Sequence, residues 1–146
     1  MTSGGYGSHL STQLCLTLAT AKMMSEAAEA EAARNGWSVV IAIMDAGGHL
    51  IHLAKMDGTQ YASVEVAQQK GRTAVSFKRP TKALEQVVSG GRMVMLKLPG
   101  ATPIEGGLPI VVDGQVIGAV GVSGVQSHED AQIAQAGIDA LLKALG

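Results

Sequence analysis

The sequence predicts an α+β domain with about five antiparallel strands and flanking helices. Two strand–turn–strand patterns carry this prediction, one around residues 45–48 and one around Asp113-Gly114. Asp-Gly is a strong hairpin signal because a type I′ turn needs positive φ at both central residues. A helix-forming stretch follows each pattern, and helices with one apolar face typically cover an antiparallel sheet.

The composition fits one compact, oligomeric domain rather than a nucleic-acid-binding protein. The 146 residues are 47% hydrophobic and 16% charged, with a net charge of −1, so no basic excess exists to neutralise phosphates. The aromatic residues are only Tyr6, Trp37, Tyr61 and Phe77, too few for base stacking. The single cysteine, Cys15, excludes an internal disulfide and favours a reducing compartment.

The start of the chain predicts a tail. Residues 1–13 are polar and glycine-rich, and we expect a flexible tail there, followed by a single domain over residues 14–146. The tail lacks the basic and apolar segments of a signal peptide, and no stretch is long and apolar enough to span a bilayer. We therefore expect a cytoplasmic protein without a membrane partner.

The first half of the domain predicts a helix and the first hairpin. Residues 14–34 are rich in Ala, Leu, Met, Lys and Glu, all good helix formers, and Asn35-Gly36 supplies a left-handed stop. Residues 37–45 form a short β-branched, apolar run that is typical of a buried strand. Residues 49–56 return as the second strand after the glycine turn.

Two further helices and a third strand are expected next. Residues 61–77 predict a helix, which Pro80 ends. Thr81 is placed to cap a short helix that reaches residue 88. Residues 92–98 are the expected third strand, and residues 99–105 are irregular.

The second hairpin, over residues 106–124, contains an unusual glycine pattern. Gly118, Gly121 and Gly124 recur in or just after its second strand. Because glycine weakens a strand, this spacing indicates that another backbone, a helix or a ligand comes very close. The last helix follows from Ser127, which is placed to cap it, and carries one apolar stripe to residue 145.

The four histidines are the residues most suited to ligand chemistry. They are His9, His49, His52 and His128, and no pair has the helical spacing of a metal site, so we predict no metal centre. His49 and His52 lie three apart on one strand, so at most one of them faces a given pocket. The alternatives are a surface role for His49 beside its turn and, for His9, either disorder or delivery onto a partner subunit.

Glu105 is the most interesting acid. It precedes Gly106-Gly107 in an irregular segment, and loops beside glycines often line pockets. Glu105 and His49 are therefore the candidate acid–base groups of an enzyme. A solvated acid is the alternative for Glu105.

Several segments in order resemble the GlcG/HbpS-like haem-binding family, which includes the C-terminal domain of PduO-type proteins. They are residues 40–50 with 55–58, residues 70–77 with 79–81, residues 106–110 and residues 117–124. The resemblance extends over about residues 16–145. It implies a profilin-like, five-stranded antiparallel sheet with flanking helices, and homo-oligomers. Some members bind or degrade haem or bind iron, and members occur in bacterial catabolic operons.

Two positions depart from a secreted haem-binding member of that family. Its two iron-binding glutamates match Glu65 and Gln68, and a neutral amide is a poor ligand for a hard cation, so the resemblance implies that this iron site is lost. Its haem-side threonine, in the loop before Gly-Gly, matches Ala101, with Thr102 beside it.

Three functional hypotheses follow. The first is a cytoplasmic, homo-oligomeric protein that binds haem or a small molecule as an accessory to a catabolic pathway. The second is a cofactor-independent enzyme acting on a small catabolic intermediate, and the third is a purely structural accessory oligomer. The pocket is expected where the two hairpins meet residues 99–105, within one subunit or, as the alternative, shared between subunits. Its candidate residues are His49, His9, Thr102, Glu105, Gly106 and Gly107.

Overall fold

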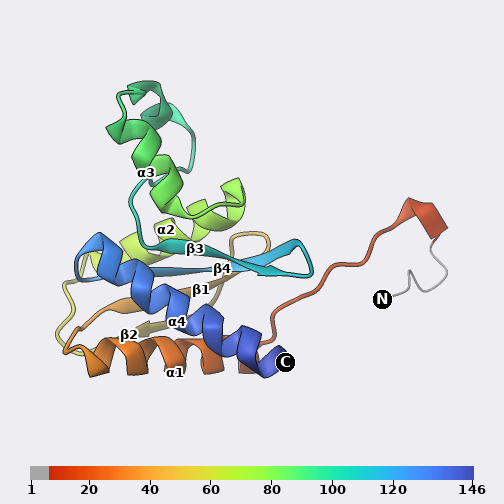
Figure 1. Ribbon diagram of the computed structural model, residues 1–146, viewed down its shortest axis with the longest axis horizontal. Coiled ribbons are helices and arrows are strands. Elements are labelled where there is room, and N and C mark those ends of the chain that lie inside the picture. Colours follow the sequence, from red (N-terminus) through yellow and green to blue (C-terminus); the bar gives the residue numbers. More distant parts are fainter. Residues whose placement is uncertain (1–6) are drawn as a thin grey trace.

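A four-stranded antiparallel sheet is the centre of the computed structural model, which describes residues 7–146 (Figure 1). Its strands are β1 (Val40–Asp45), β2 (Leu50–Lys55), β3 (Gly107–Val112) and β4 (Gln115–Ser123), in the order β2-β1-β4-β3. Both predicted hairpins are confirmed. Asp113 and Gly114 have φ angles of 50° and 74°, as a type I′ turn requires.

The helices are α1 (Leu18–Arg34), α2 (Ser63–Phe77), α3 (Thr81–Ser89) and α4 (Ser127–Leu145), with 3₁₀ turns η1 (Gly7–His9) and η2 (Met93–Lys97). The expected third strand at residues 92–98 is wrong, because η2 occupies it, so the sheet has four strands rather than about five. The segment projects with α3 away from the sheet (Figure 1), where it has no strand to pair with. Its amides bond locally instead, as from Met95 to the Arg92 carbonyl at 3.2 Å.

The helix starts differ from the predictions because other side chains supply the caps. Helix α1 begins at Leu18, four residues late, since the Thr17 hydroxyl accepts from the Thr20 amide. Gln126 and Glu129, rather than Ser127, form a capping box at α4. Thr81 begins α3, but its hydroxyl accepts from the Gly107 amide at 2.9 Å instead of capping the helix.

The sheet buries both of its faces. Helices α1 and α4 cover one face and pack on Ile41, Ile43 and Val120. Helix α2 covers the other, over Ala42, Met44 and other buried side chains. The domain is therefore a three-layer structure with the sheet in the middle (Figure 1).

The close approach that the glycines predict is that of a helix. A Cβ on Gly121 would overlap the carbonyl oxygen of Ala67, and one on Gly107 would overlap that of Lys70. Both of those carbonyls belong to α2. The glycines therefore let α2 lie directly on β3 and β4. The approach of a ligand, which was the alternative explanation, is not needed to account for Gly107 and Gly121.

A buried ion pair joins α2 to α4. Lys70 Nζ lies 3.0 Å from Asp130 Oδ2 and donates to the Val122 carbonyl, also at 3.0 Å. Asp130 Oδ1 accepts from the Val125 amide at 3.1 Å. Burial raises the pKa of the Asp130 carboxyl, and the Lys70 charge opposes that rise.

The segment before α1 runs away from the body of the domain (Figure 1). Residues 7–13 are all exposed, and the amide of Leu14 is the first to bond to the body, at 3.3 Å from Gln115 Oε1. Residues 1–6 of the predicted tail lie outside the described residues. Within residues 7–146, no helix is long and apolar enough to cross a bilayer.

Candidate functional site

Thr102 is held against α2 by a hydrogen bond to the Thr73 hydroxyl. Its amide donates to Thr73 Oγ1 at 2.9 Å. The Thr73 hydroxyl in turn donates to the Gln69 carbonyl at 2.7 Å and lies 3.3 Å from the Gly100 carbonyl. Because Thr73 is buried in α2, this irregular loop is fixed to a rigid helix.

The side chain of Thr102 begins a polar chain along α2. Its hydroxyl donates to Gln69 Oε1 at 3.3 Å, and Gln69 Nε2 donates to Glu65 Oε1 at 3.2 Å. Glu65 and Gln69 are one helical turn apart, so their side chains meet on the same side of α2. Thr102 and Gln69 are half-buried, and Glu65 is exposed.

Gly106 and Gly107 shape this region with a buried backbone. The Gly107 amide donates to Thr81 Oγ1, and the Gly106 carbonyl accepts from the Val122 amide at 3.0 Å. Glu105 precedes them, and its amide donates to Glu85 Oε1 at 3.0 Å. The Glu105 side chain is half-buried. Thr102, Glu105 and Gly106 thus lie in the loop between η2 and β3, and Gly107 begins β3; hydrogen bonds join this segment to α2 and α3.

His49 lies elsewhere, at the turn between β1 and β2. Its side chain is 83% exposed, and its Nδ1 is 3.4 Å from Asp45 Oδ1. Asp45 Oδ1 also accepts from the amides of Gly47 and His49, each at 2.9 Å. The His49 imidazole is therefore exposed to solvent, with a carboxylate beside one of its two nitrogens.

His49 and Thr102 lie beside different residues of α2. Thr102 contacts Gln69 and Thr73. A Cβ on Gly48, beside His49, would meet Arg72 and Val75. His9 is exposed in η1, away from both.

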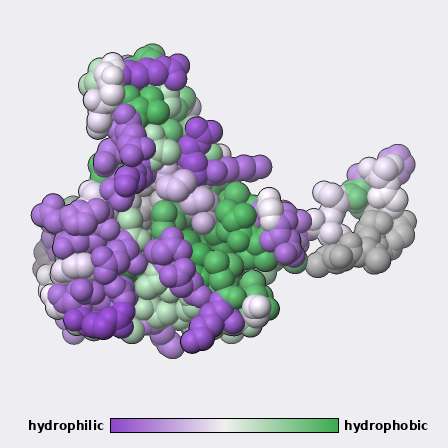
Figure 2. All heavy atoms as spheres, viewed as in Figure 1, coloured by the Kyte–Doolittle hydropathy of each residue, from purple (hydrophilic) through white to green (hydrophobic). Residues whose placement is uncertain are grey.

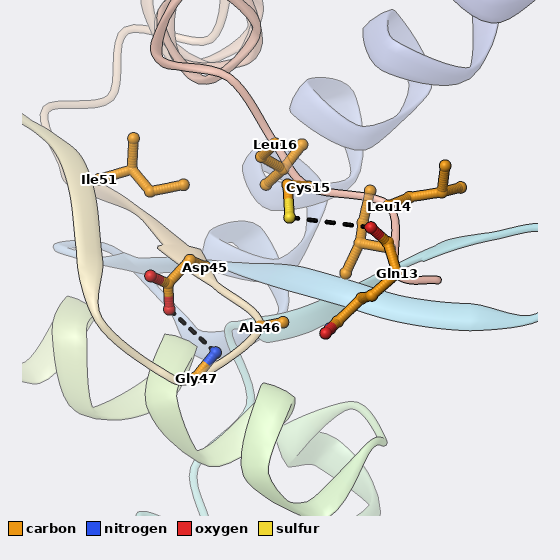
Figure 3. Close-up of a pocket in the computed structure, with 9 residues that line it drawn as sticks. Gln13, Leu14, Cys15, Leu16, Asp45, Ala46, Gly47 and Ile51 are labelled. Carbon is orange, nitrogen blue, oxygen red and sulfur yellow. Dashed lines mark hydrogen bonds between the residues drawn. The ribbon is translucent and has the colours of Figure 1, made fainter. Parts of the chain in front are cut away.

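Four of the cavities on the surface of residues 7–146 are lined by residues other than the candidates. One, of about 270 Å³, lies beneath residues 13–16 (Figure 3). A second cavity, of about 170 Å³, shares Cys15 and Leu16 with the first as lining residues. The other two lie beside Lys78 and beside Tyr61. Ligand pockets for larger molecules are about 300–1,000 Å³ and enclose most of the ligand. The cavities beside Lys78 and Tyr61, of about 410 and 470 Å³, fall in that range of volumes, but neither is lined by Thr102 or His49.

The donors fit haem iron in their chemistry. Neutral imidazole nitrogen is the usual protein ligand of haem iron, and His49 presents an imidazole beside the Asp45 carboxylate. Thr102 adds a hydroxyl oxygen. In contrast, the Gln68 amide donates to the Val64 carbonyl of its own helix at 2.9 Å, and no cluster of three or more His, Cys, Asp or Glu occurs among the residues that the structure describes.

Sequence reasoning missed the residues that position the donors. Gln69 and Thr73 lie four residues apart, which places two polar groups on one side of a helix. Nothing in the sequence indicates that residues 100–102 contact that side. Asp45 had a signal in the sequence, because an Asp at the start of Asp-Ala-Gly-Gly readily accepts hydrogen bonds from the backbone amides that follow it. That signal predicts the turn and the carboxylate beside His49 together.

Comparison with known proteins identifies relatives across most of the chain. Residues 16–139 match the family model "Haem degrading protein HbpS-like". Protein GlcG of Escherichia coli K12 is 44% identical over 114 residues, which cover 78% of this chain and 85% of GlcG. Crystal structures of HbpS (TM-score 0.85, 31% identity, 92% of this chain and 96% of that chain) and of a complex of PduOC with haem (0.79, 30%, 87% and 95%) are similar.

Proposed function

This chain belongs to the HbpS-like family, and we propose that it is a haem-binding protein whose site is completed by a second copy. The observation that carries the proposal is the His49 imidazole, which is exposed and lies beside the Asp45 carboxylate. It offers the type of nitrogen that haem iron takes. The similarity to a haem complex supports haem as the ligand.

Two imidazoles are candidates for the iron ligand in this proposal. His49 is one, and His9 from a neighbouring copy is the other, because the segment before α1 extends away from the body of its own domain (Figure 1). Thr102 supplies an oxygen ligand, and the Gly106-Gly107 backbone keeps its loop close to α2. Bound haem supplies redox and oxygen chemistry at its iron; the protein supplies ligands and walls.

Exposed apolar surface supports the proposed second copy. The arm formed by α3 and η2 exposes Val87, Met93, Val94 and Leu96, and Val94 is 63% exposed. Figure 2 shows apolar residues at the end of this arm. Such patches commonly mark protein interfaces. We further propose a cytoplasmic location and an accessory role in a catabolic pathway, as the resemblance to catabolic-operon proteins suggests.

Titration of the purified apoprotein with hemin tests haem binding. We expect a shifted Soret band that saturates, and a shift that His49→Ala or His9→Ala alters. His128→Ala is the matched control, because His128 is exposed at the start of α4, and it should titrate like the wild type. A wild type without a Soret shift refutes haem binding; a shift unchanged in both variants refutes histidine ligation.

The alternative is a cofactor-independent enzyme. It is favoured by the half-buried Glu105 side chain, which lies in the same loop as Thr102. It predicts turnover of a small catabolic intermediate by apoprotein, abolished by Glu105→Gln and retained by Glu129→Gln. Wild-type rates in Glu105→Gln would remove Glu105 from this account.

A further inference from the structure

We propose that Gln69 is a positioning residue that fixes the direction of the Thr102 hydroxyl, and that Glu65 fixes Gln69 in turn. The inference rests on the proposed function, in which Thr102 offers its oxygen to haem iron. Its basis is the chain of two hydrogen bonds from Thr102 to Gln69 to Glu65 on α2.

The carboxylate of Glu65 sets the orientation of the Gln69 amide. An ionised carboxylate only accepts hydrogen bonds, whereas a glutamine has an NH₂ that donates and an oxygen that accepts. Gln69 therefore turns its NH₂ toward Glu65, at 3.2 Å. Its carbonyl oxygen is left facing the opposite way, toward Thr102.

That carbonyl oxygen then sets the direction of the Thr102 proton. A hydroxyl has one proton and two lone pairs, and the proton of Thr102 is directed to Gln69 Oε1, 3.3 Å away. The loop is held against α2 independently, because the Thr102 amide bonds to Thr73 at 2.9 Å. The lone pairs of Thr102 are thus free for another partner, and the side chain presents itself as an acceptor.

An acceptor at this position selects among ligands. It suits an electron-poor atom such as haem iron, or the donor end of a polar group, and disfavours an anion. Reversing the direction of the two hydrogen bonds from Thr102 to Gln69 to Glu65 should make Thr102 favour an anion instead. In Glu65→Lys the ammonium only donates, so the Gln69 oxygen turns toward it, and the NH₂ turns toward Thr102.

The first test uses apoprotein and needs no ligand. Three-bond NMR couplings to the Thr102 methyl report its χ1 angle. We expect a single rotamer in the wild type and averaging in Gln69→Leu. Gln68→Leu is the matched control, since Gln68 bonds to its own helix backbone, and it should keep the single rotamer. A single rotamer in Gln69→Leu would overturn the positioning role.

The second test measures hemin affinity and the Soret position. We expect Thr102→Val to weaken binding about tenfold, the scale of one lost interaction of about 1.4 kcal/mol. Gln69→Leu and Glu65→Lys should weaken binding and move the Soret band as Thr102→Val does. The double variant Thr102→Val/Gln69→Leu should be no weaker than Thr102→Val alone, because Gln69 acts through Thr102.

The outcomes separate this inference from the proposed function. If hemin does not bind, or Thr102→Val binds as the wild type does, the proposed ligation fails, and the apoprotein couplings still decide the positioning role. If Thr102→Val loses affinity while Gln69→Leu and Glu65→Lys do not, the positioning role fails and ligation stands. Additive losses in the double variant would also overturn the positioning role.

Discussion

Gly121 and Gly107 show how single residues decide the architecture of this protein. Both lie where the backbone of α2 rests on the sheet, and neither leaves room for a Cβ. The sequence predicted a close approach at Gly121 from the glycine spacing alone. It did not identify the group that approaches, because a helix backbone and a ligand both need a position without a side chain.

Gly121→Ala should destabilise the protein by about 3 kcal/mol or prevent folding, because the added methyl overlaps backbone that cannot rotate away. Chemical denaturation measures the change. The matched control is Gly36→Ala, which has positive φ but open space around it, and should cost about 1 kcal/mol. Equal losses in the two variants would show that steric overlap with α2 is not the cause.

The second prediction at this scale concerns pH. Burial raises the pKa of the Asp130 carboxyl in the folded protein. A raised pKa adds stability that is fully present below the unfolded value, about 3.9, and is lost as pH rises through the folded value. The free energy of unfolding of the wild type, relative to Asp130→Asn, should therefore fall as pH rises from about 4 toward neutrality.

Denaturant titrations at several pH values measure this difference. Asp139→Asn, at an exposed position of the same helix, is the control and should track the wild type. If the free energy of unfolding of the wild type, relative to Asp130→Asn, rose with pH, the prediction would be contradicted. It would mean that the Lys70 charge, rather than burial, dominates the carboxyl.

At the scale of elements, α2 organises the candidate site. It packs on the sheet, holds the Thr102 loop through Gln69 and Thr73, and meets the turn beside His49. The sequence predicted this helix and the irregular loop from local signals. It could not predict their contact, because the pairing of residues 73 and 102 depends on tertiary packing.

Thr73→Val should release the loop from α2, because the variant keeps the shape of threonine and loses the hydroxyl that bonds to Thr102 and Gly100. We expect faster amide exchange over residues 100–106 and a stability loss of about 1–3 kcal/mol. Ser76→Ala, at an exposed position of α2, is the control. Unchanged amide exchange over residues 100–106 in Thr73→Val would contradict the role of Thr73 in holding the loop against α2.

The same comparison explains the one strand that the sequence predicted wrongly. Residues 93–96 are all apolar, which suits a strand, but a strand also needs a neighbour. On the α3–η2 arm no sheet edge is within reach, so the backbone closes into a 3₁₀ turn. Local composition identified an apolar segment and could not identify its partner.

For the whole molecule, the exposed apolar arm and the extended segment before α1 are the two features on which the proposed assembly rests (Figures 1 and 2). The low charge and apolar content of the sequence favour an oligomer, and that stays a prediction. Which surfaces meet is a property of the assembled fold. The candidate donors also lie on separate elements, His49 at the turn between β1 and β2 and Thr102 in the loop before β3.

Val94→Glu should weaken self-association, because it places a charge in the exposed apolar patch of η2. Sedimentation velocity should show a smaller species than the wild type at equal concentration. Ser89→Glu adds the same charge on the same arm at an exposed polar position and should leave the assembly intact. A wild type that sediments as a monomer, or a Val94→Glu variant of unchanged size, would contradict this role of the arm.

Native mass spectrometry of the hemin-loaded protein tests the central claim most directly, because it reads haem content and subunit number in one ion. We predict haem in dimers or larger assemblies and haem-free monomers, with haem lost as copies separate. Haem retained on monomers would contradict a shared site, and assemblies without haem would contradict haem binding itself.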